Sequence, residues 1–257
     1  MIEAIVLGCG TSHGVPTIAC DCSVCRSEHP KNQRTRSGLL LSGELGNVLV
    51  DAPPELRLQL CRERISSVEG VILTHSHADH LMGLDDLRRF NELTRNPMPI
   101  WAQSSVLEDV RRIFRYALTP PEEKGGGVPS YELMEVSERI EIAGVPIETF
   151  EVLHGRLPVL GLRVGDLAYL TDVSEIPKDV FNRLEGLRTL ILDATRIAPH
   201  PTHFHFERSL EVAKLIGAET TYLTHLSHDY DYDETSAGLP PSIRLSYDGL
   251  RIQVSLV

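Results

Sequence analysis

Short apolar runs alternate with amphipathic segments along most of the chain. Runs rich in aliphatic and β-branched residues predict strands at residues 2–7, 38–41, 48–50, 70–73, 100–102, 145–151, 160–164, 168–170, 189–192, 221–223 and 251–256. Apolar residues at helical spacing predict helices at 54–64, 83–92, 106–116 and 206–216, and Gly217 is placed to end the last of these. The segment 119–130, which contains PP and GGG, predicts a surface loop. Interleaved strands and helices indicate an α/β protein.

The length admits one large domain or two small ones, and the composition is that of an ordinary globular protein. The chain has 257 residues, of which 42% are hydrophobic and 24% charged. Because no linker, repeat or low-complexity tract interrupts it, we expect a single domain spanning residues 1–257. The N-terminal apolar run is too short for a signal peptide, and no run approaches the length of a membrane span. These features predict a cytoplasmic protein with no membrane partner.

The charge limits the class of partner. The formal net charge is −11 with histidine neutral, so the surface is not built to neutralise the many phosphates of a long nucleic acid. A small anionic substrate remains compatible with this charge, because bound cations can reverse the local field.

The densest chemical signal is the segment Thr74-His75-Ser76-His77-Ala78-Asp79-His80, directly after a predicted strand. A solvent-exposed polar loop would not need so many ligand-type side chains in so few positions. Imidazole and carboxylate groups are ligands for Zn²⁺, Mn²⁺ or Fe²⁺, and the residue types alone do not separate these ions. The pattern H-x-H-x-D-H therefore predicts a metal site.

Together with later strand-end residues, this segment resembles the metallo-β-lactamase superfamily. His154, Asp172 and His225 each close or follow a predicted strand, and Asp51 matches the family's early aspartate. The resemblance implies a four-layer αββα sandwich and two divalent ions, Zn²⁺ or Mn²⁺. It assigns the first ion to His75, His77 and His154, the second to Asp79, His80 and His225, and a bridging role to Asp172.

Two cations that share one water molecule lower its pKa, so that hydroxide forms near neutral pH. A bridging hydroxide of this kind can attack an ester, a lactone or a phosphodiester. Asp79 and Asp172 are therefore expected to be catalytic, through the ions that they hold.

A second cluster narrows the resemblance. Cys20, Cys22 and Cys25 form a C-x-C-x-x-C pattern, and His228 lies three residues after the final metal histidine. This combination resembles the PhnP-like phosphodiesterases, which share ancestry with tRNase Z. Three thiolates and one imidazole form a closed tetrahedral set, which suits a structural Zn²⁺. Cys9 and Cys61 are interpreted as small core residues.

Further residues are candidates for substrate binding. The segment His200-Pro201-Thr202-His203-Phe204-His205 precedes the predicted helix 206–216, and phosphodiesterases of this branch carry a phosphate-facing histidine before such a helix. The branch pattern favours His203 as the catalytic histidine, with His205 in reserve. Ser12 lies in a glycine-rich turn expected to line the pocket. The basic run 31–36 is interpreted as a solvated face, from which Arg34 or Arg36 is a candidate for neutralising a second phosphate.

The function predicted from these features is hydrolysis of a small phosphodiester, such as a cyclic ribose or nucleotide phosphate. One rival is tRNA 3′-end processing, which needs a basic arm that this acidic chain does not display. A lactonase or thioesterase would not require His203. A non-catalytic binding module is disfavoured, because every expected ligand position is filled. The resemblance is also compatible with a homodimer.

Overall fold

The strands of the chain form two sheets of seven strands that face each other. The computed structural model describes residues 2–118 and 127–256. In sheet order, the first sheet is β14 (Leu250–Val254), β1 (Ile2–Gly8), β2 (Gly38–Gly43), β3 (Gly46–Val50), β4 (Gly70–Ile72), β5 (Met98–Ala102) and β6 (Tyr131–Glu135). Strands β3 to β6 pair in parallel, and the pairs β14–β1, β1–β2 and β2–β3 are antiparallel.

The second sheet has the same mixed character. Its order is β13 (Ile243–Leu245), β12 (Thr220–Thr224), β11 (Thr189–Asp193), β10 (Leu167–Leu170), β9 (Leu157–Val164), β8 (Val145–His154) and β7 (Arg139–Ile142). Strands β10 to β13 pair in parallel, whereas β7 to β10 are joined as antiparallel neighbours.

Side chains alternate between two cores along the strands, as a pleated strand buried on both faces requires. In β1, Ala4 and Val6 pack into the core between the sheets, and Ile5 and Leu7 pack into a second core under the helices. Residues of β10 to β12 contribute to a third core on the outer face of the second sheet. Three apolar layers separate four layers of secondary structure, and the predicted αββα sandwich is confirmed.

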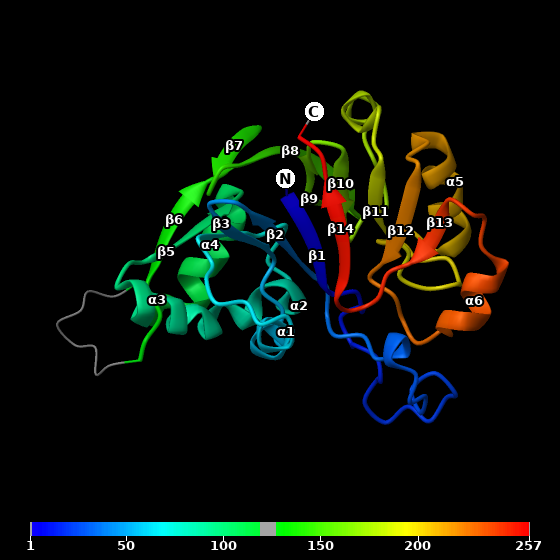
Figure 1. Ribbon diagram of the computed structural model, residues 1–257, viewed down its shortest axis with the longest axis horizontal. Helices are drawn as coiled ribbons and strands as arrows, with labels where there is room; N and C mark the ends of the chain where they lie inside the picture. Colours follow the sequence, from blue (N-terminus) through cyan, green and yellow to red (C-terminus); the bar gives the residue numbers. More distant parts are fainter. Residues whose placement is uncertain (1, 119–126, 257) are drawn as a thin grey trace.

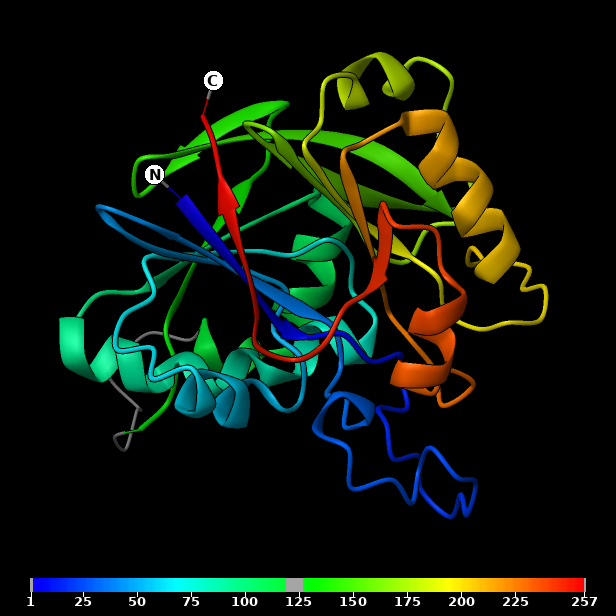
Figure 2. The same ribbon diagram turned by 45° about the vertical axis from the view of Figure 1, so that its right-hand side comes forward.

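The helices cover the outer faces of both sheets (Figure 1, Figure 2). The first sheet is covered by α1 (Leu56–Arg62), α2 (Ala78–Leu81), α3 (Arg88–Thr94) and α4 (Ser104–Ile113), and α5 (Phe206–Ile216) and α6 (Tyr232–Gly238) lie beside the second. Short 3₁₀ helices are η1 (Pro30–Asn32), η2 (Met82–Leu87), η3 (Arg115–Ala117) and η5 (Val180–Leu184). Within the described ranges, no helix has the length and hydrophobicity needed to cross a bilayer.

Most predicted elements are present, and the omissions have physical causes. Helix α5 has the predicted bounds, and Gly217 ends it in the left-handed conformation at φ 72°. Strands β6, β7 and β13 and helix α6 were not predicted. Helix α6 buries no residue and so has no amphipathic signal; Asp231 caps it by accepting from two backbone N–H groups. Of the predicted loop 119–130, residues 119–126 lie outside the described residues.

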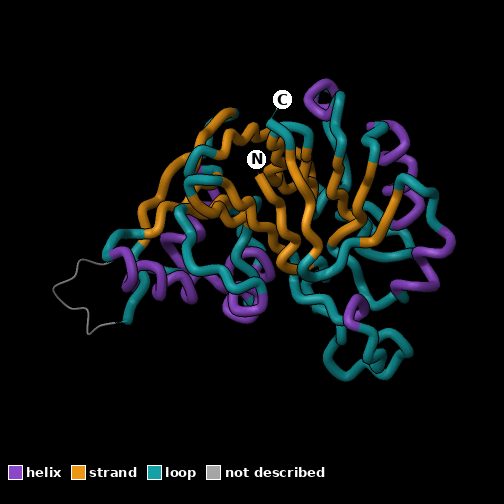
Figure 3. Tube along the Cα trace, in the orientation of Figure 1, coloured by secondary structure: helices purple, strands orange, loops and turns teal. Residues whose placement is uncertain are grey.

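The connection between β1 and β2 projects from the body of the molecule (Figure 3). Its buried Arg34 ties it back, because Nη1 donates to the carbonyl of Ser227 at 3.0 Å and Nη2 to that of Tyr230 at 2.7 Å. Asn32 Nδ2 also donates to Asp231 Oδ2 at 2.9 Å. These bonds hold the projecting loop against the segment that follows β12.

Helix α1 gives a direct test of the outer core. Leu56 is 0% exposed, whereas Leu58, two residues further along the same helix, is 52% exposed. Leu56→Ala should lower the free energy of unfolding by about 2–5 kcal/mol, because it leaves a cavity. Leu58→Ala should change it by less than about 0.5 kcal/mol. Chemical denaturation of both variants measures this difference, and equal effects would contradict the placement of α1.

Candidate metal centre

The predicted site residues converge because strand ends from both sheets meet at one edge. His154 is the last residue of β8, and the others follow the strands β3, β4, β10 and β12 within a few residues. In chain order, the residues brought to this edge are Asp51, His75, His77, Asp79, His80, His154, Asp172 and His225. Two rigid sheets therefore fix the positions of side chains that are far apart in the sequence.

Three of these residues have left-handed backbone conformations. The φ angles are 65° at Asp51, 54° at Asp172 and 59° at His225. Aspartate and histidine tolerate this region better than most side chains, but it remains uncommon for any residue other than glycine. Such conformations concentrate at functional sites, and here each turns a side chain inward at the end of a strand.

Asp172 is common to three groups of potential ligand atoms. One group contains Asp79, His80 and His225; another contains His75 and His77; the third contains His154 and His203, and in each group the ligand atoms lie within 4.8 Å of one another. The carboxylate of Asp172 lies 3.1 Å from His80 Nε2, 3.5 Å from His225 Nε2 and 3.9 Å from His75 Nε2. A carboxylate in this position can bridge two ions.

The orientation of the imidazoles fits divalent cations. The Nε2 atoms of His75, His80 and His225 are buried and have no hydrogen-bond partner among the described residues. Nδ1 of His80 is hydrogen-bonded to the carboxylate of Asp51 at 2.7 Å, and Nδ1 of His225 to the hydroxyl of Thr195 at 2.9 Å. Unpaired buried nitrogens are costly, and a metal-ligating histidine characteristically uses its other nitrogen in such a bond. The residues present therefore fit metal ions.

The charges of the site also call for cations. Burial alone would raise the pKa of Asp172, but His225 and His80 hold it well below the usual value. Burial likewise opposes ionisation of Asp79, yet the imidazoles of His225 and His80, whose Nε2 atoms lie 3.6 and 3.4 Å from its Oδ2, lower its pKa. Burial lowers the pKa of His75 well below its usual value, which leaves a neutral imidazole. The same carboxylates raise the pKa of His80 and His225, so binding of a metal at these two imidazoles would displace protons.

A residue of helix α4, outside the metal centre, holds the turn that carries His75 and His77. Ser76 Oγ donates to Asp109 Oδ2 of α4 at 2.5 Å. His77 is the exposed member of its group, and its ring lies 4.6 Å from that of His75 and 5.1 Å from that of His154. Helix α4 thus positions a histidine that is itself open to solvent.

His203 lies beside the metal-ligand histidines, and His205 does not. The ring centroid of His203 is 4.3 Å from that of His154 and 4.9 Å from that of His225. His205 is the N-cap residue of α5 and belongs to none of the ligand groups found in the described residues. Of the two candidates from the sequence, only His203 lies among the candidate ligand residues of the centre.

Asp193 is a site residue that the sequence analysis missed. Its Oδ2 accepts from Nδ1 of His203 at 2.8 Å, and its Oδ1 accepts from the hydroxyl of Thr195 at 2.7 Å. Thr195 in turn contacts His225, so one buried carboxylate orients both histidines. Asp193 closes β11 just as Asp172 follows β10, and this shared strand-end position was the signal that could have identified it.

The two other substrate-binding candidates contact each other, and their role in binding substrate stays a prediction. Arg36 forms an ion pair with Glu55 and donates from Nε to the carbonyl of Ser12 at 2.8 Å. Neither residue belongs to the ligand groups among the described residues. Arg36 is thus already neutralised by a carboxylate, and Ser12 is held through its backbone.

The second predicted metal set is also assembled. The Sγ atoms of Cys20, Cys22 and Cys25 lie 3.1, 3.6 and 3.5 Å from Nδ1 of His228. A tetrahedral zinc ion, with Zn–S of about 2.3 Å and Zn–N of about 2.0 Å, would separate sulfur and nitrogen by about 3.6 Å. The N–H of Cys25 donates to Cys22 Sγ and lowers the pKa of that thiol to about 7. The four side chains fit a structural zinc ion.

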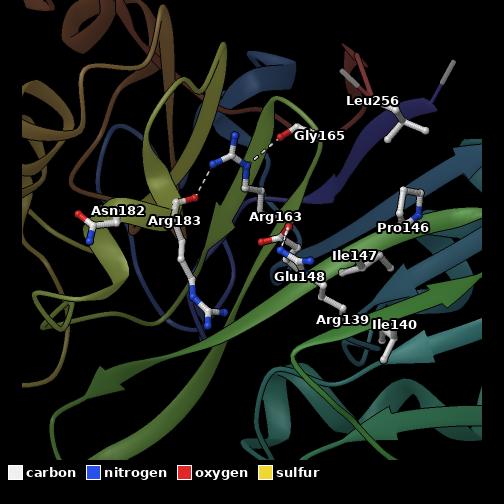
Figure 4. Close-up of a pocket in the computed structure, with 10 residues that line it drawn as sticks. All are labelled: Arg139, Ile140, Pro146, Ile147, Glu148, Arg163, Gly165, Asn182, Arg183 and Leu256. Carbon is white, nitrogen blue, oxygen red and sulfur yellow. Dashed lines mark hydrogen bonds and ion pairs between the residues drawn. The ribbon is translucent and has the colours of Figure 1, made fainter.

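A surface pocket elsewhere in the molecule is separate from this centre (Figure 4). It has a volume of about 530 Å³ and contains Arg139, Arg163 and Arg183, at the opposite end of β8 from His154. Arg163 donates to backbone carbonyls, and Arg139 pairs with Glu148 at 3.4 Å. The hydrogen-bonding capacity of these guanidinium groups is largely used within the fold, and no predicted site residue lines the pocket.

Comparison with known proteins agrees with the geometry. Residues 46–226 match the family described as "Beta-lactamase superfamily domain". The crystal structure of a diphosphatase from the PhnP family is 38% identical, with a TM-score of 0.92, and the alignment covers 100% of this chain and 99% of that one. Human tRNase Z, short form, shares the fold at 18% identity and a TM-score of 0.67, over 98% of this chain and 99% of that one.

A curated relative is longer than this chain. An octanoyltransferase of Porphyromonas gingivalis is 36% identical over 254 residues, which cover 97% of this chain and 51% of that protein. The chain therefore spans about half the length of this relative. The matched family covers most of the ligand-bearing strand ends, and the PhnP-family diphosphatase is matched from end to end. The chain belongs to the β-lactamase superfamily and, within it, to the PhnP family of metal-dependent hydrolases.

Proposed function

We propose that this protein is a phosphodiesterase that uses two divalent metal ions to hydrolyse a small phosphodiester. The observation that carries the proposal is the pair Asp193–His203, which lies against the metal-ligand histidines. Hydrolysis of a lactone or thioester at such a centre would not require this histidine. The similarity to a diphosphatase of the PhnP family supports chemistry at phosphorus.

The ligand groups divide between two ions that share Asp172. Asp79, His80 and His225 would hold one ion. By the family resemblance, His154 would join His75 and His77 at the other, and its ring centroid lies 5.1 Å from that of His77. When bound, two divalent cations would lower the pKa of a water molecule and polarise the phosphoryl oxygens. Zn²⁺ and Mn²⁺ both accept this ligand set.

Apart from the metal ligands, His203 is the side chain proposed to act directly on the reacting phosphoryl group. Its Nδ1–H donates to the buried carboxylate of Asp193, which fixes the ring and leaves Nε2 for the substrate. When both ring nitrogens carry a proton, Nε2 is a hydrogen-bond donor while Nδ1 stays bonded to Asp193. His203 can therefore donate a hydrogen bond to developing negative charge, or a proton to the leaving oxygen.

A small substrate is favoured over tRNA. The net charge of −11 opposes binding of a long polyanion, and the arginine side chains of the surface pocket in Figure 4 pair largely within the fold. A cyclic ribose or nucleotide phosphate would need only the centre and its immediate surroundings.

Replacing His203 tests the proposed reaction. His203→Ala should lower kcat for bis(p-nitrophenyl) phosphate by about 100- to 1000-fold, because charge in the transition state loses its donor. The matched control is His205→Ala, two residues away at the N-cap of α5, which should keep kcat within about threefold. Hydrolysis of a lactone that His203→Ala leaves unchanged, without phosphodiester turnover in the wild type, would contradict the proposal.

The cysteine cluster is proposed to hold a structural zinc ion that fastens the projecting loop to His228. Cys20→Ser should therefore remove about one equivalent of zinc per chain, measured by elemental analysis, and lower Tm. Cys61→Ser is the matched control. The prediction that Cys61 is a core residue was wrong, because its side chain is an exposed free thiol on α1, outside the cluster. Equal zinc contents in the wild type and in Cys20→Ser would show that the cluster holds no ion.

A further inference from the structure

His200, which contacts His203, and Arg196 of the same connection have no role in the proposed reaction. His200 and Arg196 lie in the connection between β11 and α5. The imidazole of His200 packs against that of His203, with ring centroids 4.9 Å apart and an angle of 70° between the planes. Neither His200 nor Arg196 belongs to a metal-ligand group in the described part of the chain. The pair borders the centre without being part of it.

The hydrogen bonds of His200 fix its tautomer. The backbone N–H of Thr202 donates to Nδ1 at 3.2 Å, and the hydroxyl of Thr202 is also 3.2 Å from that atom. A backbone N–H can only donate, so Nδ1 carries the lone pair, and the proton of the neutral ring is on Nε2. No hydrogen bond between described residues uses this Nε2–H. His200 therefore presents a free donor beside the centre.

Arg196 adds positive charge to the same loop. Its Nε donates to the carbonyl of Ala198 at 3.1 Å and its Nη2 to that of Pro199 at 2.6 Å. These bonds fold the guanidinium group against the residues that lead into His200. Burial and the neighbouring His203 and Arg196 lower the pKa of His200, in agreement with the neutral tautomer that its hydrogen bond from the N–H of Thr202 requires. No carboxylate among the described residues forms an ion pair with Arg196.

The neutral N–H donor of His200 and the cation of Arg196 together suit a bound anionic group. This group would be one whose charge stays the same during the reaction. The reacting phosphoryl group already has the metal ligands and His203 around it. Arg36, a candidate from the sequence for neutralising a second phosphate, is paired with Glu55. The uncompensated cation nearest to His203 in the loop 194–205 is Arg196.

We infer that His200 and Arg196 form an anion subsite that binds a second phosphoryl group, adjacent to the one that reacts. His200 donates from Nε2 to an oxygen of this group, and Arg196 supplies the opposing charge. The inference rests on the proposed function, which places the reacting phosphorus beside His203. It assigns the substrate to phosphodiesters in which a second phosphoryl group adjoins the one that reacts, and ADP presents the same pair of neighbouring phosphates.

Inhibition by AMP and ADP tests the subsite, with bis(p-nitrophenyl) phosphate as the substrate of the metal-loaded enzyme. His200→Ala and Arg196→Gln should each raise Ki for ADP by about 10-fold, the effect of one charge-assisted hydrogen bond. Ki for AMP and kcat for the chromogenic substrate should change by less than about twofold, because neither involves a second phosphate. His200→Gln, which keeps an amide N–H near the position of Nε2, should restore most of the affinity for ADP.

The matched control for loss of charge is Arg208→Gln on α5, a cation that pairs with Glu211 and should leave both inhibitors unaffected. An equal weakening of AMP and ADP in His200→Ala, or no weakening of either, would overturn the subsite. If the wild type does not hydrolyse the chromogenic diester, the proposed function fails. Calorimetric titration of the metal-loaded variants with AMP and ADP then still decides whether the subsite exists.

Discussion

The site depends on buried carboxylates whose negative charge has to be balanced by protons on the neighbouring imidazoles or by metal ions. Asp51, Asp79 and Asp172 lie within the fold beside imidazoles whose Nε2 atoms have no partner among the described residues. Burying carboxylates without compensation is expensive, and Asp51 and Asp172 raise the pKa of His80 well above its usual value against the effect of burial. Cations at the centre would relieve this cost, so metal binding should contribute to stability as well as to chemistry.

The fold supplies the rigidity that such a centre needs. The candidate ligands come from the ends of strands in both sheets. One apolar core between the sheets and one on the outer face of each sheet hold those strand ends in place. Around the ligands lies a set of orienting residues. Asp51 fixes His80, Thr195 fixes His225, and Asp109 holds the turn beside His77 through Ser76. Asp193 links this set to His203, which connects the metal centre to the side chain proposed to act on the substrate.

Residues that belong to short sequence motifs could be predicted from the sequence. Residues whose role depends on contacts between distant parts of the chain could not. The H-x-H-x-D-H segment and the cysteine cluster were recognisable because their spacing is short. Asp193 is a single strand-end aspartate, and its contact with His203 spans a loop whose path no local pattern specifies. The ion pair of Arg36 with Glu55 was likewise invisible in the sequence. Strands β6 and β7 lie at sheet edges, where exposed glutamates and an arginine interrupt the apolar pattern.

The most direct test of the account is a metal titration of the chelator-treated protein, with phosphodiester hydrolysis as the readout. Activity should be absent without metal and should rise to a plateau at about two equivalents per chain beyond the ion held by the cysteine cluster. Activity that reaches its plateau at one such equivalent would contradict the bridging role of Asp172. Full activity in the metal-free protein would contradict the central claim that this is a two-metal phosphodiesterase.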